Sequence, residues 1–114
     1  MNITIASLNV RGLANKSKRD KTFCWLKEQS FSIILLQETH SSSESNITWG
    51  KEWGNNSFFS GESTNSKGIA ILLSNDLNAK IITYTDILKG RLQALEIEIN
   101  DKSITIMNIL GKMD

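Results

Sequence analysis

The chain opens with an alternating apolar pattern, a helical pattern and an apolar run, in that order. Residues 3–9 alternate branched apolar side chains with small or polar ones, which predicts a strand. Residues 18–29 place Phe23 and Leu26 on one face and lysines on the other, which predicts a helix. Residues 31–37 are almost continuously apolar, which is typical of a strand covered on both faces. Strand, helix and strand at this spacing predict a βαβ unit with parallel strands.

The helix and the segment after the second strand carry further local signals. Ser17 suits the N-cap of the helix, because its hydroxyl can accept a hydrogen bond from a free backbone N–H. Cys24 falls inside the helix, where we expect a small buried side chain rather than a nucleophile. Residues 41–56 are largely polar and predict a loop with a short helix, in which Trp49 and Trp53 act as packing anchors.

The rest of the chain predicts short strands joined by turns. The expected strands are residues 57–60, 68–73, 79–84, 91–98 and 103–109. In the fourth of these, Gln93, Glu96 and Glu98 are expected on the exposed face. The pattern predicts an α/β fold with one mixed, largely antiparallel sheet and one main helix. Residues 69–73 and 104–110 are apolar on both faces, which one helix cannot cover, so we expect one half of a layered sandwich with the second sheet absent.

Composition narrows the class of protein. The 114 residues suffice for one domain with a modest core, and 39% hydrophobic and 22% charged residues are ordinary for a globular protein. No apolar run is long enough to span a bilayer, and no signal peptide is visible. The single cysteine agrees with a reducing compartment. We therefore expect an intracellular protein, nuclear or cytoplasmic and not secreted. A net charge of +1 neither demands nor excludes a nucleic-acid partner.

Two polar side chains stand where the first two strands end. Asn9 closes the first strand and Glu38 follows the second. Ligands of open α/β sheets bind beyond the carboxyl ends of strands, and a carboxamide with a carboxylate suits a hard metal ion and a phosphate. This placement indicates metal-dependent phosphodiester hydrolysis. A basic edge stands beside it, formed by Lys16, Lys18, Arg19 and Lys21. Phosphate contacts and an ordinary exposed helix face explain that edge equally well.

Several short blocks along the chain carry a family resemblance. They are Leu8-Asn9-Val10-Arg11-Gly12-Leu13, Lys18-Arg19, Leu36-Gln37-Glu38-Thr39-His40, Lys67-Gly68-Ile69-Ala70-Ile71-Leu72, Gly90-Arg91 and Met107-Asn108-Ile109. In this order they resemble the endonuclease/exonuclease/phosphatase superfamily. Within it, the chain looks most like the N-terminal endonuclease domain of LINE-type (non-LTR) retrotransposons, a relative of apurinic/apyrimidinic endonucleases. The resemblance covers essentially the whole chain.

The resemblance implies a four-layered α/β sandwich, of which residues 1–114 would form the N-terminal half. It implies an active site at the top of the sandwich that binds Mg²⁺, or Mn²⁺, together with the scissile phosphate. Glu38 matches the metal-binding catalytic glutamate, and Asn9 matches the catalytic asparagine that orients the site. The residues expected to contact nucleic acid are Arg11, Lys16, Lys18, Arg19 and Thr39.

The chain departs from the family pattern near its end. Asn108-Ile109 is followed by Leu110, where the family has a tyrosine with a proline two residues later. The family's Asp-x-Asn pair, Ser/Asp segment and Asp-His pair have no counterparts, and His40 does not match the catalytic histidine. We therefore expect a partial domain, lacking its C-terminal half and inactive alone, whose intact relatives hydrolyse DNA phosphodiester bonds.

Two other functions stay open. The first is a non-catalytic half-domain that binds nucleic acid, or that pairs with a missing second half or another chain. The second keeps the superfamily but changes the substrate, because its relatives also act on phosphoinositides, sphingolipids or nucleotides.

Overall fold

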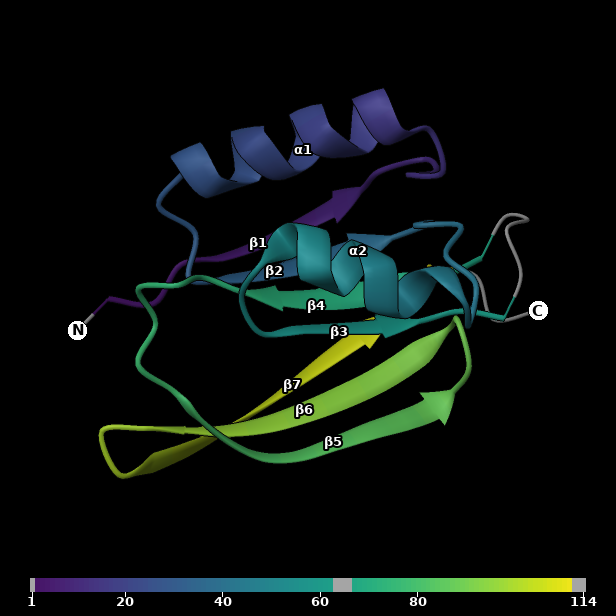
Figure 1. Ribbon diagram of the computed structural model, residues 1–114. Helices are drawn as coiled ribbons and strands as arrows, with labels where there is room; N and C mark the ends of the chain where they lie inside the picture. The colour runs from purple at the N-terminus through teal and green to yellow at the C-terminus, as the bar shows by residue number, and fades with distance from the viewer. Residues whose placement is uncertain (1, 63–66, 112–114) are drawn as a thin grey trace.

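The structure is a computed structural model that describes residues 2–62 and 67–111. Its elements are β1 (Ile5–Asn9), α1 (Lys16–Glu28), β2 (Ile33–Gln37), α2 (Ser45–Trp53), β3 (Ser57–Ser60), β4 (Ile69–Leu73), β5 (Lys80–Leu88), β6 (Leu92–Ile99) and β7 (Lys102–Ile109). Sheet A has the strand order β1-β2-β4-β3, and sheet B has the order β5-β6-β7. Figure 1 shows the two helices as one layer over sheet A, with sheet B on the opposite side of sheet A.

The predicted βαβ unit is confirmed, since β1 and β2 pair in parallel and α1 connects them. The predicted single sheet is wrong, and the second sheet is not absent. After Leu73 the chain leaves sheet A through residues 74–79 and builds sheet B against its free face (Figure 1). Strand signals in a sequence give no information about which strands share a sheet, so this division was not predictable from alternation alone. The α/β class holds, with the described residues forming one helix layer and two sheets.

The two apolar faces of sheet A account for the continuously apolar runs. Along β2, Ile34 and Leu36 face the helix layer, while Ile33 and Leu35 face sheet B. All five residues of β4 are buried, which follows from its central position between two layers. The helix-side core contains Leu13, Phe23, Leu26, Ile34, Leu36, Trp49, Trp53, Ala70 and Leu72. The core between the sheets contains Ile33, Ile71, Leu73, Leu95, Ile97, Ile99 and Ile106.

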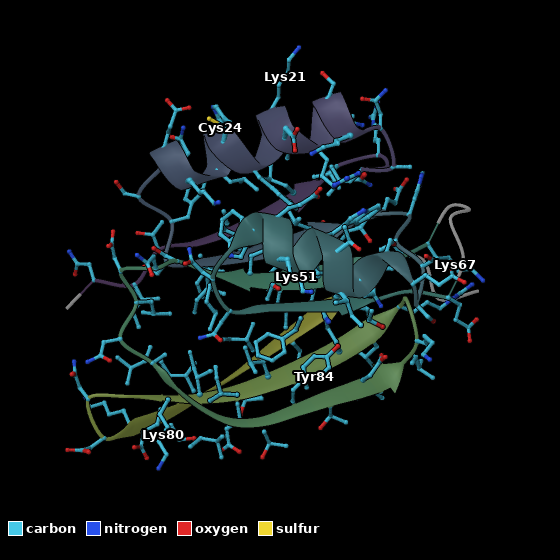
Figure 2. All side chains as sticks on the ribbon, viewed as in Figure 1. Lys21, Cys24, Lys51, Lys67, Lys80 and Tyr84 are labelled. Carbon is cyan, nitrogen blue, oxygen red and sulfur yellow. The ribbon has the colours of Figure 1, made fainter. Side chains whose placement is uncertain are left out.

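Local details of the helices differ from the sequence prediction at two positions. Asn15, not Ser17, caps α1, and its Oδ1 accepts a hydrogen bond of 2.9 Å from the backbone N–H of Lys18. Cys24 is exposed on the outward side of α1 (Figure 2), because it lies outside the Phe23 and Leu26 stripe. The short helix predicted within residues 41–56 is confirmed as α2. Its two tryptophans are buried, as expected of packing anchors.

A polar network joins the two sheets inside their shared core. The Asn108 amide nitrogen donates to the carbonyl oxygens of Leu36 and Ala70, at 3.1 and 3.0 Å, and to Gln93 Oε1 at 2.9 Å. Gln93 in turn donates to the Tyr84 hydroxyl at 2.9 Å. The predicted exposure of Gln93 is therefore wrong. Its strand turns its odd-numbered residues inward, and the buried amide is satisfied by other buried polar groups. Among the described residues, no helix has the length and apolar character needed to cross a bilayer.

Candidate metal and phosphate site

Asn9 and Glu38 lie together at the carboxyl edge of sheet A. Asn9 is the last residue of β1 and stands opposite Gln37, so Glu38 emerges beside it at the end of β2. The Asn9 amide nitrogen donates to Glu38 Oε2, and Asn9 Oδ1 accepts from the backbone N–H of Arg11 at 3.0 Å. Both ends of the amide are thereby fixed, and the carboxylate is held in one orientation. The structure brings together the pair that the strand ends predicted.

The backbone around this pair adopts an unusual conformation. Arg11 and Glu38 both have positive φ, at 51° and 54°, in the left-handed region that side chains other than glycine seldom occupy. Hydrogen bonds between the two loops hold this shape: Val10 N donates to Gln37 O at 3.0 Å, and Gly12 N donates to Glu38 O at 2.6 Å. Such backbone conformations concentrate at functional sites, because only a surrounding that over-determines them keeps them populated.

The pair opens into a cleft of about 700 Å³ between the ends of β1, β2 and β7. The lining residues are Ser7, Asn9, Gln37, Glu38, Ile109, Leu110 and Gly111. Gln37 forms the floor, since its amide nitrogen donates to Ser7 Oγ at 3.0 Å and to Asn108 Oδ1 at 3.1 Å. Among the described residues of this lining, Glu38 is the one titratable side chain. The described lining of the cleft therefore offers one carboxylate and no second acid or base.

The donor set suits a hard, largely hydrated cation. Within residues 2–62 and 67–111, no three His, Cys, Asp or Glu side chains gather as a metal cage. Magnesium does not require one, because it keeps several waters and binds through one or two carboxylates plus substrate phosphate oxygens. Asn9 engages Glu38 Oε2, which leaves Oε1 for a cation. The residues present fit one protein ligand of a magnesium or manganese ion, and they do not fit a tetrahedral zinc site.

Arg19 is not a surface residue, contrary to the nucleic-acid contact expected of it. It is buried under α2, where its Nε donates to Glu52 Oε1 at 2.6 Å and its guanidinium lies 4.8 Å from the ring centre of Trp49. The hydrogen bond from Arg19 lowers the pKa of Glu52. Lys16 lies at the rim of this pair, and its pKa is raised by hydrogen bonds, first to Asp20 and then to Glu52. Lys16 and Arg19 of α1 thus both contact Glu52 of α2.

The other expected contacts divide between the surface and the interior. Thr39 is fully buried and its hydroxyl lies 3.0 Å from Ser41 Oγ, so it does not reach a ligand at the surface. Lys18 is exposed, but its ammonium donates to the carbonyl oxygens of Val10 and Arg11 at 2.8 and 3.1 Å. It therefore anchors the loop that follows Asn9. Arg11 is exposed beside the cleft and remains a candidate for phosphate contact, with Lys18 next to it.

His40 is a loop residue, as expected, and it packs beneath Gly12. A Cβ atom at position 12 would come within 2.6 Å of His40 Nδ1, so this close contact requires glycine. Nε2 of His40 is buried and has no hydrogen-bond partner within the described part of the chain. The imidazole is not part of the cleft lining, and no base for the Asn9–Glu38 site comes from it.

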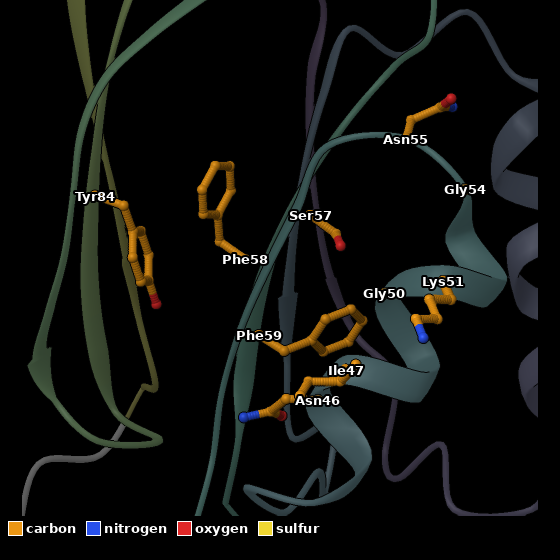
Figure 3. Close-up of a pocket in the computed structure, with 10 residues that line it drawn as sticks. All are labelled: Asn46, Ile47, Gly50, Lys51, Gly54, Asn55, Ser57, Phe58, Phe59 and Tyr84. Atoms are coloured by element: carbon orange, nitrogen blue, oxygen red, sulfur yellow. The ribbon is translucent and has the colours of Figure 1, made fainter.

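A second hollow, of about 650 Å³, lies along β3 and α2 (Figure 3). Phe58 and Tyr84 stack between the two sheets there, with ring centres 4.9 Å apart, while Gly50 and Lys51 lie on the opposite side of β3. Burial raises the pKa of the Tyr84 hydroxyl. The described lining of this hollow contains no carboxylate, thiol or imidazole. Among the described lining residues this hollow therefore has no side chain suited to a divalent metal, and the Asn9–Glu38 cleft stays the candidate site.

Sequence reasoning missed the residues that support the site from below. Ser7 and Gln37 line the cleft, and Asn108 connects Gln37 to both sheets. One signal was present in the sequence. Asn108 continues the inward-facing series of Ile104 and Ile106, so a polar residue stands at a core position. A buried amide in such a place must find hydrogen-bond partners in the opposite sheet.

Comparison with known proteins gives the chain a relative. No known family model matches the sequence. Over 109 residues, which are 96% of the chain, it is 28% identical to a Xenopus laevis protein described as the transposon TX1 uncharacterized 149 kDa protein. The chain spans about 8% of the length of that protein. It is therefore similar to one small part of a transposon protein.

Proposed function

We propose that this chain carries the metal- and phosphate-binding part of a site that hydrolyses DNA phosphodiester bonds, as the N-terminal part of an endonuclease/exonuclease/phosphatase domain would. The observation that carries this proposal is the Asn9–Glu38 hydrogen bond, formed where two adjacent parallel strands end in an open cleft. A ligand at this edge of the sheet follows the general rule for α/β folds. The residues and their order along the chain are those expected from the family resemblance.

Each residue of the site has a separate task in this proposal. Glu38 would hold a magnesium or manganese ion through its carboxylate, and Asn9, which donates to Oε2, fixes the orientation of that carboxylate. Arg11 and Lys18 give positive charge beside the cleft for a phosphate oxygen. A divalent ion bound there would stabilise the negative charge that develops on the phosphate during hydrolysis. Lys18 has a second task, since it fixes the loop that presents Arg11.

The cleft has a carboxylate suited to binding a metal ion but lacks, among its described residues, a separate base for hydrolysis. Activating a water requires a base within hydrogen-bond reach, and Glu38 is the one titratable group among the described lining residues. A glutamate that holds the metal cannot serve as the base as well. Loss of one member of a catalytic unit often costs several orders of magnitude in rate. We therefore expect this chain alone to bind metal and DNA and to cut DNA very slowly.

The transposon relative favours DNA as the substrate over a lipid or a nucleotide. The chain is similar, over 96% of its own residues, to part of a protein described as a transposon protein, and a transposon is a DNA element. The exposed basic groups beside the cleft fit a phosphate backbone, which binding proteins contact without reading sequence. A nucleic-acid-binding half-domain without catalysis is the second candidate function, and it is favoured because the described lining of the cleft holds no titratable group besides Glu38.

The test separates metal binding from hydrolysis. Free Mn²⁺ gives a sharp electron paramagnetic resonance signal that bound Mn²⁺ loses, so titration of the chain measures metal binding directly. Glu38→Gln should weaken Mn²⁺ binding at least tenfold. Glu44→Gln, an exposed glutamate at the start of α2, should leave it unchanged. Equal Mn²⁺ binding by both variants would reject the metal site.

Nicking of supercoiled plasmid then tests the reaction. Any magnesium-dependent cutting should be slow, and Glu38→Gln should abolish it while Glu44→Gln does not. DNA binding without cutting, unaffected by Glu38→Gln, would favour the non-catalytic half-domain. Fast cutting that survives Glu38→Gln would contradict both functions.

A further inference from the structure

Gln37 lines the Asn9–Glu38 cleft and directly precedes the glutamate in the chain. β1 and β2 pair in parallel with Asn9 opposite Gln37, so both side chains lie on the same face of sheet A. The cleft therefore contains a second amide beside that of Asn9. The two ends of an amide are similar in shape, and their hydrogen-bond partners determine which end is the oxygen.

The orientation of the Gln37 amide is fixed from inside the core. Asn108 Nδ2 faces the backbone carbonyl oxygens of Leu36 and Ala70, which accept hydrogen bonds but cannot donate them. The other end of the Asn108 amide is therefore its oxygen, which needs a donor. The Gln37 atom that lies 3.1 Å from this oxygen is accordingly the nitrogen, Nε2. Nε2 also lies 3.3 Å from Leu35 O, a further acceptor.

The Gln37 oxygen is left for the cleft. Nε2 donates to Ser7 Oγ, Leu35 O and Asn108 Oδ1, and within the described part of the chain Oε1 accepts no hydrogen bond. Oε1 is not one of the buried polar atoms that lack a partner, so it reaches the space that Gln37 lines. Linked hydrogen bonds polarise one another, so an amide that donates through its nitrogen accepts more strongly at its oxygen.

Gln93 shows how a purely structural amide is bonded in the same core. Its Nε2 donates to the Tyr84 hydroxyl and to Phe58 O, at 2.9 and 3.1 Å, and its Oε1 accepts from Asn108 at 2.9 Å. Both ends of Gln93 are thus used inside the protein. Gln37 belongs to the same network but contributes only its nitrogen to it. The network alone therefore accounts for one end of Gln37 and leaves the other end without a role.

We propose that Gln37 is a positioning residue of the metal site, and that its Oε1 accepts a hydrogen bond from a water of the hydrated cation at Glu38. This inference rests on the proposed function, because it needs a cation there. Magnesium keeps several of its waters when it binds a protein, and those waters donate to nearby oxygens. Asn9 and Gln37 then have different tasks, since Asn9 orients the carboxylate through its nitrogen and Gln37 orients the hydration shell through its oxygen.

Carbon NMR of the wild type tests the oxygen directly. Titration with Mg²⁺ should shift the side-chain carbonyl carbon of Gln37, because a new hydrogen bond to Oε1 polarises that carbonyl. The carbonyl carbon of Gln93 is the internal control and should not shift, because its oxygen already accepts from Asn108. Hexaamminecobalt(III) should shift Gln37 in the same way. Its ammonia ligands do not exchange, so it offers hydrogen bonds and no open coordination position.

Three NMR results would overturn the proposal. The first is a Gln37 carbonyl carbon that does not respond to Mg²⁺. The second is an equal response of Gln37 and Gln93, which would indicate a change spread through the network. The third is a Gln37 response to Mg²⁺ but not to hexaamminecobalt(III), which would indicate direct coordination instead of contact through a water.

Variants separate this inference from the proposed function. Gln37→Met removes the oxygen at nearly the same side-chain length, and it should weaken Mn²⁺ binding about three- to tenfold in the paramagnetic resonance titration. Gln29→Met is the matched control and should bind Mn²⁺ like the wild type, because the Gln29 amide donates to Trp25 O outside the cleft.

Glu38→Gln tests the proposed function itself. If Glu38→Gln leaves Mn²⁺ binding unchanged, the metal site and the role of Gln37 are both wrong. If Glu38→Gln weakens binding and Gln37→Met does not, only the role of Gln37 is wrong. The carbonyl shift in the wild type distinguishes a direct role of the oxygen from loss of the contact with Asn108, and it decides the matter if Gln37→Met does not fold.

Discussion

Replacing Asn108 should weaken the contact between the two sheets without changing the alternation of apolar and polar residues in the other strands. Its side chain makes four hydrogen bonds, to Leu36 O, Ala70 O, Gln93 Oε1 and Gln37 Nε2, between 2.9 and 3.1 Å. A buried hydrogen bond contributes about 0.5–1.5 kcal/mol net, and polar partners left unsatisfied add to the loss, so Asn108→Ala should cost about 3–5 kcal/mol. That is a large part of the roughly 5–15 kcal/mol by which a small domain is stable.

A urea melt followed by tryptophan fluorescence measures this loss. With a urea dependence of about 1.5 kcal/mol per molar, the midpoint should fall by about 2–3 M. Thr105→Ala is the control, because Thr105 is exposed on the same strand and its side chain takes no part in the network.

Asn108→Asp sharpens the test through its pH dependence. A carboxylate cannot donate to the carbonyl oxygens of Leu36 and Ala70, and burial beside them disfavours its charge. The pKa of the new carboxyl should be higher in the folded chain than in the unfolded one. The free energy of unfolding of Asn108→Asp should then fall as pH rises through the folded pKa of this carboxyl, and it should recover in acid. The reasoning is refuted if Asn108→Ala melts like Thr105→Ala, or if Asn108→Asp is as stable as the wild type at neutral pH.

Two further predictions concern the loops and the helix layer. Gly68→Ala should destabilise the chain by about 1–3 kcal/mol in the same melt, because φ is +114° there and the new Cβ would lie 2.5 Å from Thr39 Oγ1. Gly111→Ala is the control and should be neutral, because a Cβ there meets nothing within 4 Å. Equal effects of the two substitutions would contradict this account. The pKa of Glu52 is lowered by the hydrogen bond from Arg19. The ionised Glu52 therefore contributes its full stabilisation of the folded chain above the ordinary pKa of 4.5, and this contribution is lost as pH falls through the folded pKa. The stability difference between wild type and Glu52→Gln should therefore shrink in acid, and a difference that is constant with pH would argue against it.

The sequence patterns predicted the local structure better than its assembly. Periodicity located the strands and α1 to within a few residues, and the polar residues at the ends of β1 and β2 identified the Asn9–Glu38 pair. Both signals are local, because strand alternation and helix spacing depend on neighbours in the chain. The division into two sheets was missed, since it depends on which strands pair across long separations.

The misassigned polar residues share one physical cause. Gln93, Arg19 and Thr39 are buried, although residues of these types are mostly exposed. Arg19 and Gln93 find partners on other elements, Glu52 for Arg19 and Tyr84 for Gln93, whereas the Thr39 hydroxyl pairs with Ser41 in the same loop. Composition and spacing do not reveal such partners, so a polar residue was assigned to the surface by default. Cys24 is the reverse case, since its position relative to the helix stripe indicated exposure and its residue type suggested burial.

The network around Asn108 explains why sheet B matters to the Asn9–Glu38 pair, which stands at the edge of sheet A. Gln37 directly precedes Glu38, and its amide is fixed by Ser7 on one side and Asn108 on the other. A shift of β7 by one residue would exchange Asn108 for a side chain on the opposite face, because side chains alternate along a strand. Gln37 would then lose its partner in sheet B, and the floor beneath Glu38 would lose a fixed point. Variants of Asn108 should therefore weaken Mn²⁺ binding even where the chain remains folded, and Thr105→Ala should not.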